Sequence, residues 1–215
     1  MSAGASAAGV LAAKETMSKT FDFYFDFGSP ASYLAWTQLP ALCADTGASV
    51  NYRPMLLGGV FQATGNQSPI MIPAKGKYTL ADFVRHARRY GVPLNHNPHF
   101  PINTLLLMRG AAGLQLNRDT RFFDYCDAMF NGIWVEARNL ADPVVVGHVL
   151  AQAGFDPAAL MALSSLSEVK DRLKTLTQDA VDRGIFGAPT FFVGDQMYWG
   201  QDRLEWVREA LAASS

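Results

Sequence analysis

The chain has 215 residues, of which 49% are hydrophobic and 17% are charged, and its formal net charge is -1. This composition predicts one globular domain, with or without an insertion. The near-neutral charge gives little of the attraction to phosphate that dominates nucleic-acid binding, and no apolar run approaches the roughly 20 residues that span a bilayer. We therefore expect neither a nucleic acid nor a membrane as a partner.

The first 18 residues are predicted to form a disordered tail. Met1 to Thr16 is rich in Ala, Ser and Gly and lacks a basic segment before its short apolar run, so it makes a poor secretory signal. Met17 stands close before the first predicted strand and is a candidate for the biological start. With neither an export signal nor a disulfide framework in the sequence, the expected location is the cytoplasm.

A strand, a turn and a helix follow the tail. From Phe21 to Phe27 an aromatic residue occupies every second position, which predicts a strand with one buried face. Gly28 permits a turn, Ser29 suits a helix cap and Pro30 suits the first helical position. A helix is therefore predicted over 31–44, with Gly47 just beyond its end.

After this helix, one more strand is predicted, and a series of helices follows it. A second strand is predicted over 49–55, followed by a short turn or helix over 56–65 and a Pro/Gly-rich segment over 66–76. Helical spacing recurs, broken by Gly, Pro or Asn, in 80–90, 103–116, 121–134, 143–153, 157–163 and 167–183. The densest basic group lies in the first of these helices and is interpreted as a solvated face; its members are Arg85, His86, Arg88 and Arg89.

Strands return after Gly187. Residues 190–193 and 196–199 read as a hairpin joined by the two-residue turn Gly194-Asp195, and a last helix is predicted from near Gln201-Asp202 to near Ala212. This order predicts an α/β, thioredoxin-like fold with an inserted all-helical domain. The expected parts are the disordered tail 1–18, a thioredoxin-like domain made of 19–77 and 184–215, and a helical insertion over 78–183.

The chain lacks the cysteine pair of a redox enzyme. Where a thioredoxin-type enzyme carries Cys-x-x-Cys, the sequence reads Ser29-Pro30-Ala31-Ser32. Its two cysteines, Cys43 and Cys126, lie far apart, so neither a redox pair nor a cysteine-built zinc site is available. His96 and His99 are separated by a proline and are interpreted as loop residues. We expect no metal, and the serine turn indicates that the chain holds the sulfur of another molecule.

Single positions leave two interpretations open. Ser29 alone is an ordinary helix cap. Pro189 is either a plain turn residue or the cis-proline of a loop that faces the helix start, and only about one X-Pro bond in twenty is cis. Asp202 is either a cap or a side chain that holds an ammonium group at a helix start that also receives a carboxylate. The clustering of these positions at helix starts and strand ends favours a site.

Five segments, in this order, resemble the 2-hydroxychromene-2-carboxylate isomerases, which belong with the kappa-class glutathione transferases. They are the strand and turn 25–33, the run Tyr52-Arg53-Pro54, the segment 65–78, the loop 186–190 and the segment 199–204. The resemblance extends from Lys19 to about Leu211. It implies a thioredoxin-like fold of the DsbA type, glutathione as the cofactor thiol, and a homodimer.

The resemblance also assigns residues to parts of glutathione. Ser29 matches the serine that hydrogen-bonds the sulfur, and the backbone of Ala188, just before Pro189, matches the group that pairs with the glutathione cysteine. A thiol with a pKa of roughly 8.5 is mostly protonated at neutral pH, although the thiolate is the nucleophile. A serine hydroxyl and the positive end of the helix that starts at Pro30 both favour the anion.

The two ends of glutathione have their own candidates. The resemblance implies that Asn66 and Lys75 reach the glycyl end or the sulfur side, and that Gln201 and Asp202 hold the γ-glutamyl end. Gln201 departs from the Ser or Asn that relatives often carry. The substrate carboxylate would need a cationic or amide partner, for which Arg53, Lys75 and Asn66 are the candidates.

For the isomerases, the resemblance implies transient addition of the glutathione thiolate to a conjugated carbon of 2-hydroxychromene-2-carboxylate or its ring-opened form. Rotation about the resulting single bond and elimination then give trans-o-hydroxybenzylidenepyruvate. The segment 100–109 is a candidate wall over the aromatic substrate, although core packing predicts the same composition. Two alternatives remain open, a kappa-class glutathione transferase or peroxidase and a non-catalytic module that binds glutathione or protein. The natural substrate is either this chromene or a related unsaturated aromatic acid.

Overall fold

The computed structural model describes residues 19–213. The predicted tail 1–18 and the candidate start at Met17 lie outside the described residues. Within the described range, no helix combines the length and the apolar character that crossing a bilayer requires.

The centre of the fold is a mixed four-stranded sheet with the order β2-β1-β3-β4. Strand β1 (Thr20–Phe25) runs parallel to β2 (Ser49–Pro54) and antiparallel to β3 (Thr190–Val193), which pairs antiparallel with β4 (Gln196–Trp199). The last two strands are joined by a two-residue turn in which Gly194 has a φ of 57°, a value that favours glycine. The predicted strands and hairpin are therefore confirmed.

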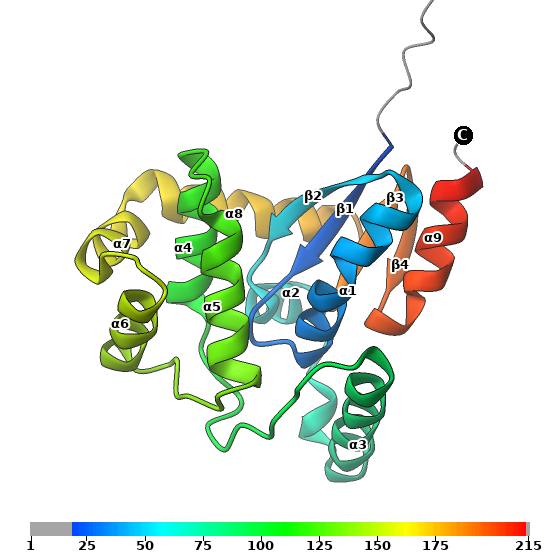
Figure 1. The fold of residues 1–215 in the computed structure, drawn as a ribbon, viewed down its shortest axis with the longest axis horizontal. Coiled ribbons are helices and arrows are strands. Elements are labelled where there is room, and N and C mark those ends of the chain that lie inside the picture. Colours follow the sequence, from blue (N-terminus) through cyan, green and yellow to red (C-terminus); the bar gives the residue numbers. More distant parts are fainter. Residues whose placement is uncertain (1–18, 214–215) are drawn as a thin grey trace, which may run out of the picture.

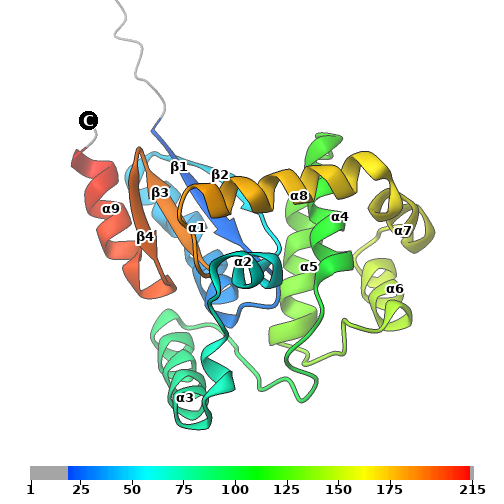
Figure 2. The same cartoon turned by 180° about the vertical axis from the view of Figure 1, so that it is seen from behind.

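Helices cover both faces of this sheet. One face packs against α1 and α9, and the other packs against α2 and α8 (Figures 1 and 2). The helical elements among residues 19–213 are α1 (Pro30–Thr46), α2 (Leu57–Thr64), η1 (Pro69–Met71), α3 (Pro73–Tyr90), α4 (Leu105–Leu116), α5 (Phe122–Trp134), α6 (Pro143–Gln152), α7 (Pro157–Ser165), α8 (Ser167–Asp182), η2 (Gln201–Arg203) and α9 (Leu204–Ala213). This arrangement is the thioredoxin-like fold expected from the sequence.

The aromatic alternation of β1 builds the main core. Phe21, Phe23 and Phe25 are fully buried on the α1 side, where the rings of Phe23 and Phe191 stack with centroids 5.3 Å apart. The prediction of a single buried face was nevertheless incomplete. Tyr24, on the opposite face, is also buried because α2 and α8 cover that side.

The start of α1 follows the sequence prediction in detail. Ser29 caps the helix, Pro30 occupies its first turn, and Gly47 ends it with a φ of 68° while donating its N–H to Cys43 O at 2.8 Å. The chain therefore leaves β1 through a tight turn and enters α1 with the backbone N–H groups of its first turn facing the end of the sheet.

Helix α3 begins earlier than predicted. The segment 66–76 reads as a loop, yet η1 occupies part of it and α3 starts at Pro73. Gly76 lies inside this helix, where a Cβ would meet Ile70 Cα at 3.1 Å, so the glycine permits close packing of α3 on η1. Helices α4 to α7 lie beside the sheet, and α8 returns across its second face (Figure 2). The expected division at 77/78 falls inside α3; the division into two parts remains a proposal.

Candidate functional site

The hydroxyl of Ser29 lies at the start of α1 and makes two hydrogen bonds. Its Oγ accepts a hydrogen bond from Ser32 N at 3.1 Å and donates one to Ala188 O at 3.0 Å. The bond to Ala188 O directs the hydroxyl hydrogen across the turn. Ser29 is therefore a cap for its own helix and a donor toward the facing loop.

The facing loop carries the predicted proline in the cis form. The Ala188-Pro189 peptide bond is cis, which the sequence alone could not show. Pro189 O accepts from Gly200 N at 3.0 Å, and Thr190 Oγ1 donates to Gly187 O at 2.8 Å. These bonds fix the loop between the start of α1 and the turn that precedes α9.

The turn before α9 brings Gln201 and Asp202 to the same end of the sheet. Gln201 is buried, and its carbonyl accepts a hydrogen bond from Tyr90 Oη at 3.1 Å. Burial, followed by the nearby carboxylate of Asp202, raises the pKa of Tyr90. Tyr90 is therefore a proton donor at neutral pH. Asp202 belongs to the 3-10 turn η2, and among residues 19–213 its carboxylate accepts from the Arg203 guanidinium and makes no capping bond to a backbone N–H, so the interpretation of Asp202 as a simple cap is wrong.

The buried Asp26 holds the serine turn in place through hydrogen bonds. Asp26 accepts hydrogen bonds from Gly28 N at 2.8 Å, Leu57 N at 2.8 Å and Thr104 Oγ1 at 2.7 Å. Its own carbonyl accepts from Ser29 N at 3.0 Å. Burial raises the pKa of Asp26, although the three donors oppose that shift. Asp26 was not among the residues expected from the sequence, where its one visible signal is an acidic residue two positions before the turn glycine.

Asn66 is tied to the same loop, whereas Lys75 is not. Asn66 Nδ2 donates to Phe186 O at 2.7 Å, two residues before Ala188. Lys75 lies in the first turn of α3 with an exposed side chain, and within residues 19–213 it makes no hydrogen bond or ion pair. The structure thus joins Asn66 to the loop and leaves the Lys75 ammonium free to meet a ligand.

Arg53 lies away from the residues that gather around Ser29. Its Nε is 3.5 Å from Asp22 Oδ1, and the same carboxylate is 2.5 Å from Arg183 Nη1. Arg53 pairs in register with Tyr24, whose side chain packs on the α2 and α8 face of the sheet. The structure therefore does not bring Arg53 to the Ser29 group, because strand alternation directs its side chain to the opposite face.

An apolar groove of about 70 Å³ opens beside the start of α1. Its wall is fixed partly by Trp134, whose Nε1 donates to Phe27 O at 2.8 Å and whose ring lies 5.5 Å from that of Phe100. Of the expected wall 100–109, only Phe100 lines the groove, since Leu107 and Met108 are buried in the core. The groove is lined by Pro30, Leu80, Phe83, Val84, Leu94, Asn95, His96, Asn97, Phe100 and Trp134.

The two histidines read as loop residues lie in the loop between α3 and α4, as predicted. His96 nevertheless lines the apolar groove, a place that its sequence context did not indicate.

Neither cysteine supplies a reactive thiolate. Cys126 is fully buried and Cys43 is partly buried, and burial raises the pKa of both thiols. A nucleophilic sulfur at Ser29 would therefore have to come from a bound molecule.

Comparison with known proteins shows the family of the chain. The family model described as a DSBA-like thioredoxin domain matches residues 20–212. A protein from Sphingobium xenophagum named 2-hydroxychromene-2-carboxylate isomerase is 34% identical over 91% of this chain and 99% of its own. A solved 2-hydroxychromene-2-carboxylate isomerase is 31% identical, with a TM-score of 0.79 over 91% of this chain and 95% of that one. The kappa 2 glutathione transferase of Caenorhabditis elegans is 26% identical over 90% of this chain and 92% of its own.

Proposed function

Because the chain belongs to the DsbA-like thioredoxin family, and within it to the group of the 2-hydroxychromene-2-carboxylate isomerases, we propose that it is a glutathione-dependent isomerase. Its reaction would interconvert 2-hydroxychromene-2-carboxylate, or a related unsaturated aromatic acid, and trans-o-hydroxybenzylidenepyruvate. The isomerase names of the relatives support an enzymatic activity. The observation that carries the proposal is the Ser29 hydroxyl, held as a donor at the start of α1 in a turn without cysteine.

The residues at this end of the sheet fit glutathione. Ser29 offers a hydroxyl donor for the sulfur, and Ala188 offers a backbone next to a cis-proline for the cysteine unit. Asn66 and Lys75 would hold the glycyl end or the sulfur side, and Asp202 would hold the γ-glutamyl end together with Gln201. When bound, glutathione supplies the thiolate that adds transiently to the substrate.

The chain itself would contribute charge stabilisation and placement. The Ser29 hydroxyl and the N–H groups at the start of α1 favour an anion at the turn. To donate to a ligand, Ser29 would release Ala188 O, which then becomes an acceptor for a peptide-like N–H. The apolar groove next to Pro30 would hold the aromatic ring away from water.

The position of Arg53 argues against this residue as the partner of the substrate carboxylate. Arg53 is engaged with Asp22 on the far face of the sheet, so Lys75 and Asn66 remain the candidates. The cytoplasmic location, the homodimer and a role in the catabolism of aromatic compounds stay predictions.

Turnover assays separate the proposal from its alternatives. An isomerase converts 2-hydroxychromene-2-carboxylate only when glutathione is present and returns the glutathione unchanged. A kappa-class transferase, which the relatives at 24–26% identity keep as the second candidate, would instead conjugate a chlorodinitrobenzene-type electrophile and consume glutathione. Glutathione binding with no turnover of either compound would support a binding module and overturn the enzymatic proposal.

A further inference from the structure

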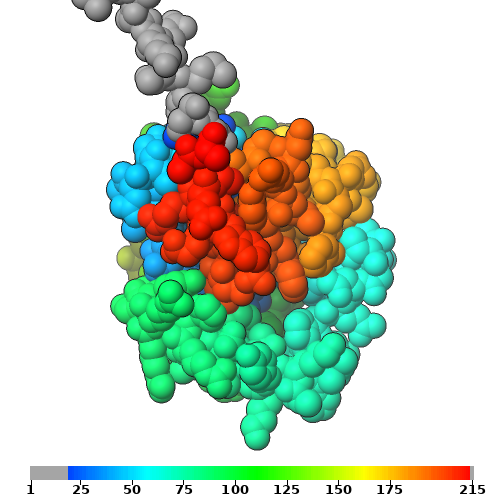
Figure 3. Space-filling view, turned by 90° about the vertical axis from the view of Figure 1, so that its right-hand side faces the viewer, coloured from blue at the N-terminus to red at the C-terminus, as the bar shows by residue number. Residues whose placement is uncertain are grey.

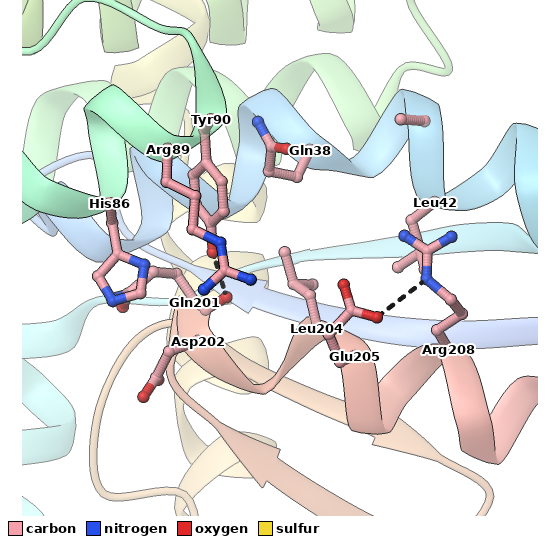
Figure 4. A pocket seen from close by; sticks show the side chains of 11 residues that line it. Gln38, Leu42, His86, Arg89, Tyr90, Gln201, Asp202, Leu204, Glu205 and Arg208 are labelled. Atoms are coloured by element: carbon pink, nitrogen blue, oxygen red, sulfur yellow. Dashed lines mark hydrogen bonds and ion pairs between the residues drawn. The ribbon is translucent and has the colours of Figure 1, made fainter.

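Helix α3 borders two cavities of different character. Its residues His86, Arg89 and Tyr90 line a pocket of about 170 Å³, whose other walls come from α1, η2 and the start of α9 (Figure 4). In the space-filling view, α3 and the preceding segment face β4 and α9 across an indented surface (Figure 3). The basic group of α3 is therefore only partly the solvated face interpreted from the sequence, since His86 and Arg89 line this pocket.

An aromatic ring fits the apolar groove better than this pocket. The pocket is lined by charged side chains of both signs, among them Arg89 and Asp202, and a ring placed there would displace water from these charges. The walls that α3 and α5 give the groove are apolar, and the groove also lies against Pro30, the residue next to Ser29. A substrate carbon at the sulfur site would therefore direct its aromatic ring into the groove.

The proposed substrate carries one oxygen on its aromatic ring. In 2-hydroxychromene-2-carboxylate this oxygen closes the second ring, and in trans-o-hydroxybenzylidenepyruvate it is a phenol hydroxyl ortho to the unsaturated chain. A phenol hydroxyl that enters an apolar groove without a hydrogen-bond partner is destabilised, because it gives up its bonds to water. The groove therefore needs a polar group within reach of the ring.

The loop between α3 and α4 gives the groove three polar side chains, those of Asn95, His96 and Asn97. Asn95 donates from its backbone and from its side chain to the carbonyls of Trp134 and Val135. Asn97 is buried and donates from its side chain to the carbonyl of Ile133 at 3.0 Å. The two asparagines therefore tie the loop to the end of α5 on both sides of His96.

The imidazole of His96 is left free. It is exposed at the groove, and among residues 19–213 it makes no hydrogen bond or ion pair. The indole N–H of Trp134, another polar group of the wall, is already donated to Phe27 O at 2.8 Å. A neutral imidazole has one donor and one acceptor nitrogen. It can therefore donate to the ring oxygen of the closed chromene and accept from the phenol hydroxyl of the open form.

Resting on the proposed isomerase function, we propose that His96 binds the oxygen ortho to the side chain of the aromatic ring. His96 then determines specificity, because it selects aromatic acids that carry an ortho oxygen against those that lack one. The asparagines on both sides hold its backbone, so His96 meets the ring without a rearrangement of the loop. His96 is a binding residue for the substrate, and it takes no part in holding glutathione.

Two stable aromatic acids isolate the contribution of this oxygen. The acids trans-2-hydroxycinnamate and trans-cinnamate have the same unsaturated side chain and differ only in the ortho hydroxyl. Binding calorimetry without glutathione, so that no thiol adds to them, should show that the wild type binds the hydroxylated acid about two- to tenfold more tightly, the effect of one neutral hydrogen bond. His96→Phe should lose this preference and keep the wild-type affinity for glutathione, whereas His96→Gln, which retains a donor and an acceptor, should keep part of the preference.

His99→Phe is the matched control. His99 belongs to the same loop but does not line the groove, so this variant should keep the wild-type preference for the hydroxylated acid. The proposal is overturned if His96→Phe keeps that preference, or if the wild type binds the two acids equally or binds neither. In those cases the proposed function still stands, provided that the wild type converts the chromene carboxylate with glutathione. If it does not, both this proposal and the proposed function are wrong.

Discussion

The hydroxyl of Ser29 donates a hydrogen bond of 3.0 Å to the carbonyl of Ala188, 159 residues further along the chain. This bond joins the start of α1 to the cis-proline loop and places the two groups assigned to the sulfur and to the cysteine backbone of glutathione side by side. The backbone of the loop is itself fixed to the turn before α9 through Pro189 O. The site is therefore assembled by the fold, since three segments distant in sequence meet there.

The buried Asp26 should make stability depend on pH in a defined direction. Burial raises its pKa above the ordinary value of 3.8, so just above that pH the folded protein retains a proton that the unfolded chain has released. The contribution of Asp26 to the free energy of unfolding is then present at low pH and falls as pH rises through the raised pKa. Chemical denaturation at a series of pH values should show this fall in the wild type and its absence in Asp26→Asn.

Two further variants sharpen this test. Thr104→Val removes a donor that lowers the pKa of Asp26, so the fall should extend to higher pH. Asp26→Ala leaves two partly buried N–H groups and one buried hydroxyl without their acceptor and should cost about 3 kcal/mol. A constant difference between wild type and Asp26→Asn across this pH range would show that the carboxyl titrates alike in both states.

The apolar groove should govern affinity for the aromatic substrate and leave thiol binding alone. Val84 lines the groove and is 39% exposed, so Val84→Glu should fold normally. Because a charge there removes apolar contact with an aromatic ring, we expect KM for the chromene carboxylate to rise roughly three- to tenfold, with glutathione affinity unchanged. Val144→Glu, at another exposed position outside the groove, is the control. Equal kinetics for the two variants would exclude the groove as the substrate site.

The cysteines of the chain should be dispensable. Burial raises the pKa of both thiols, and neither Cys43 nor Cys126 has a partner for disulfide formation among residues 19–213. The double variant Cys43→Ser, Cys126→Ala should retain glutathione-dependent turnover, measured beside circular dichroism to confirm equal folding. Loss of turnover in a folded double variant would mean that a thiol of the chain takes part in the reaction.

The sequence predicts those parts of the fold that neighbouring residues determine. The alternation from Phe21 to Phe27 and the series Gly28, Ser29 and Pro30 specify a strand, a turn and a helix start from neighbouring residues alone. The start of α3 was missed because prolines and glycines in 66–76 are typical of loops, whereas Gly76 serves the close packing of α3 on Ile70. That contact depends on tertiary packing.

The same distinction holds for the candidate site. Ser29, Ala188 and Asn66 were predicted, and the structure brings these three together. The hydrogen bonds that hold Asp26 beneath the serine turn come from residues as distant in sequence as Thr104, and no spacing in the sequence indicates these partners. Arg53 was placed at the site although its position in β2 directs it to the other face, because register between strands cannot be read from one strand.

Ser29→Ala addresses the thiolate directly. The substitution removes a helix cap, worth about 1 kcal/mol of stability, together with the donor for the sulfur. Asp156→Ala removes the cap of α7 and leaves the site intact, so it controls for the loss of stability alone.

The most direct measurement is the pKa of the glutathione thiol on the protein, followed through the ultraviolet absorbance of the thiolate. We expect the wild type and Asp156→Ala to hold this pKa below that of a free thiol, roughly 8.5. In Ser29→Ala it should rise by roughly one to two units, because a hydrogen bond to a charged acceptor is worth about 1.5 to 3 kcal/mol. A thiol that titrates identically in the wild type and in Ser29→Ala would contradict the role given to this hydroxyl.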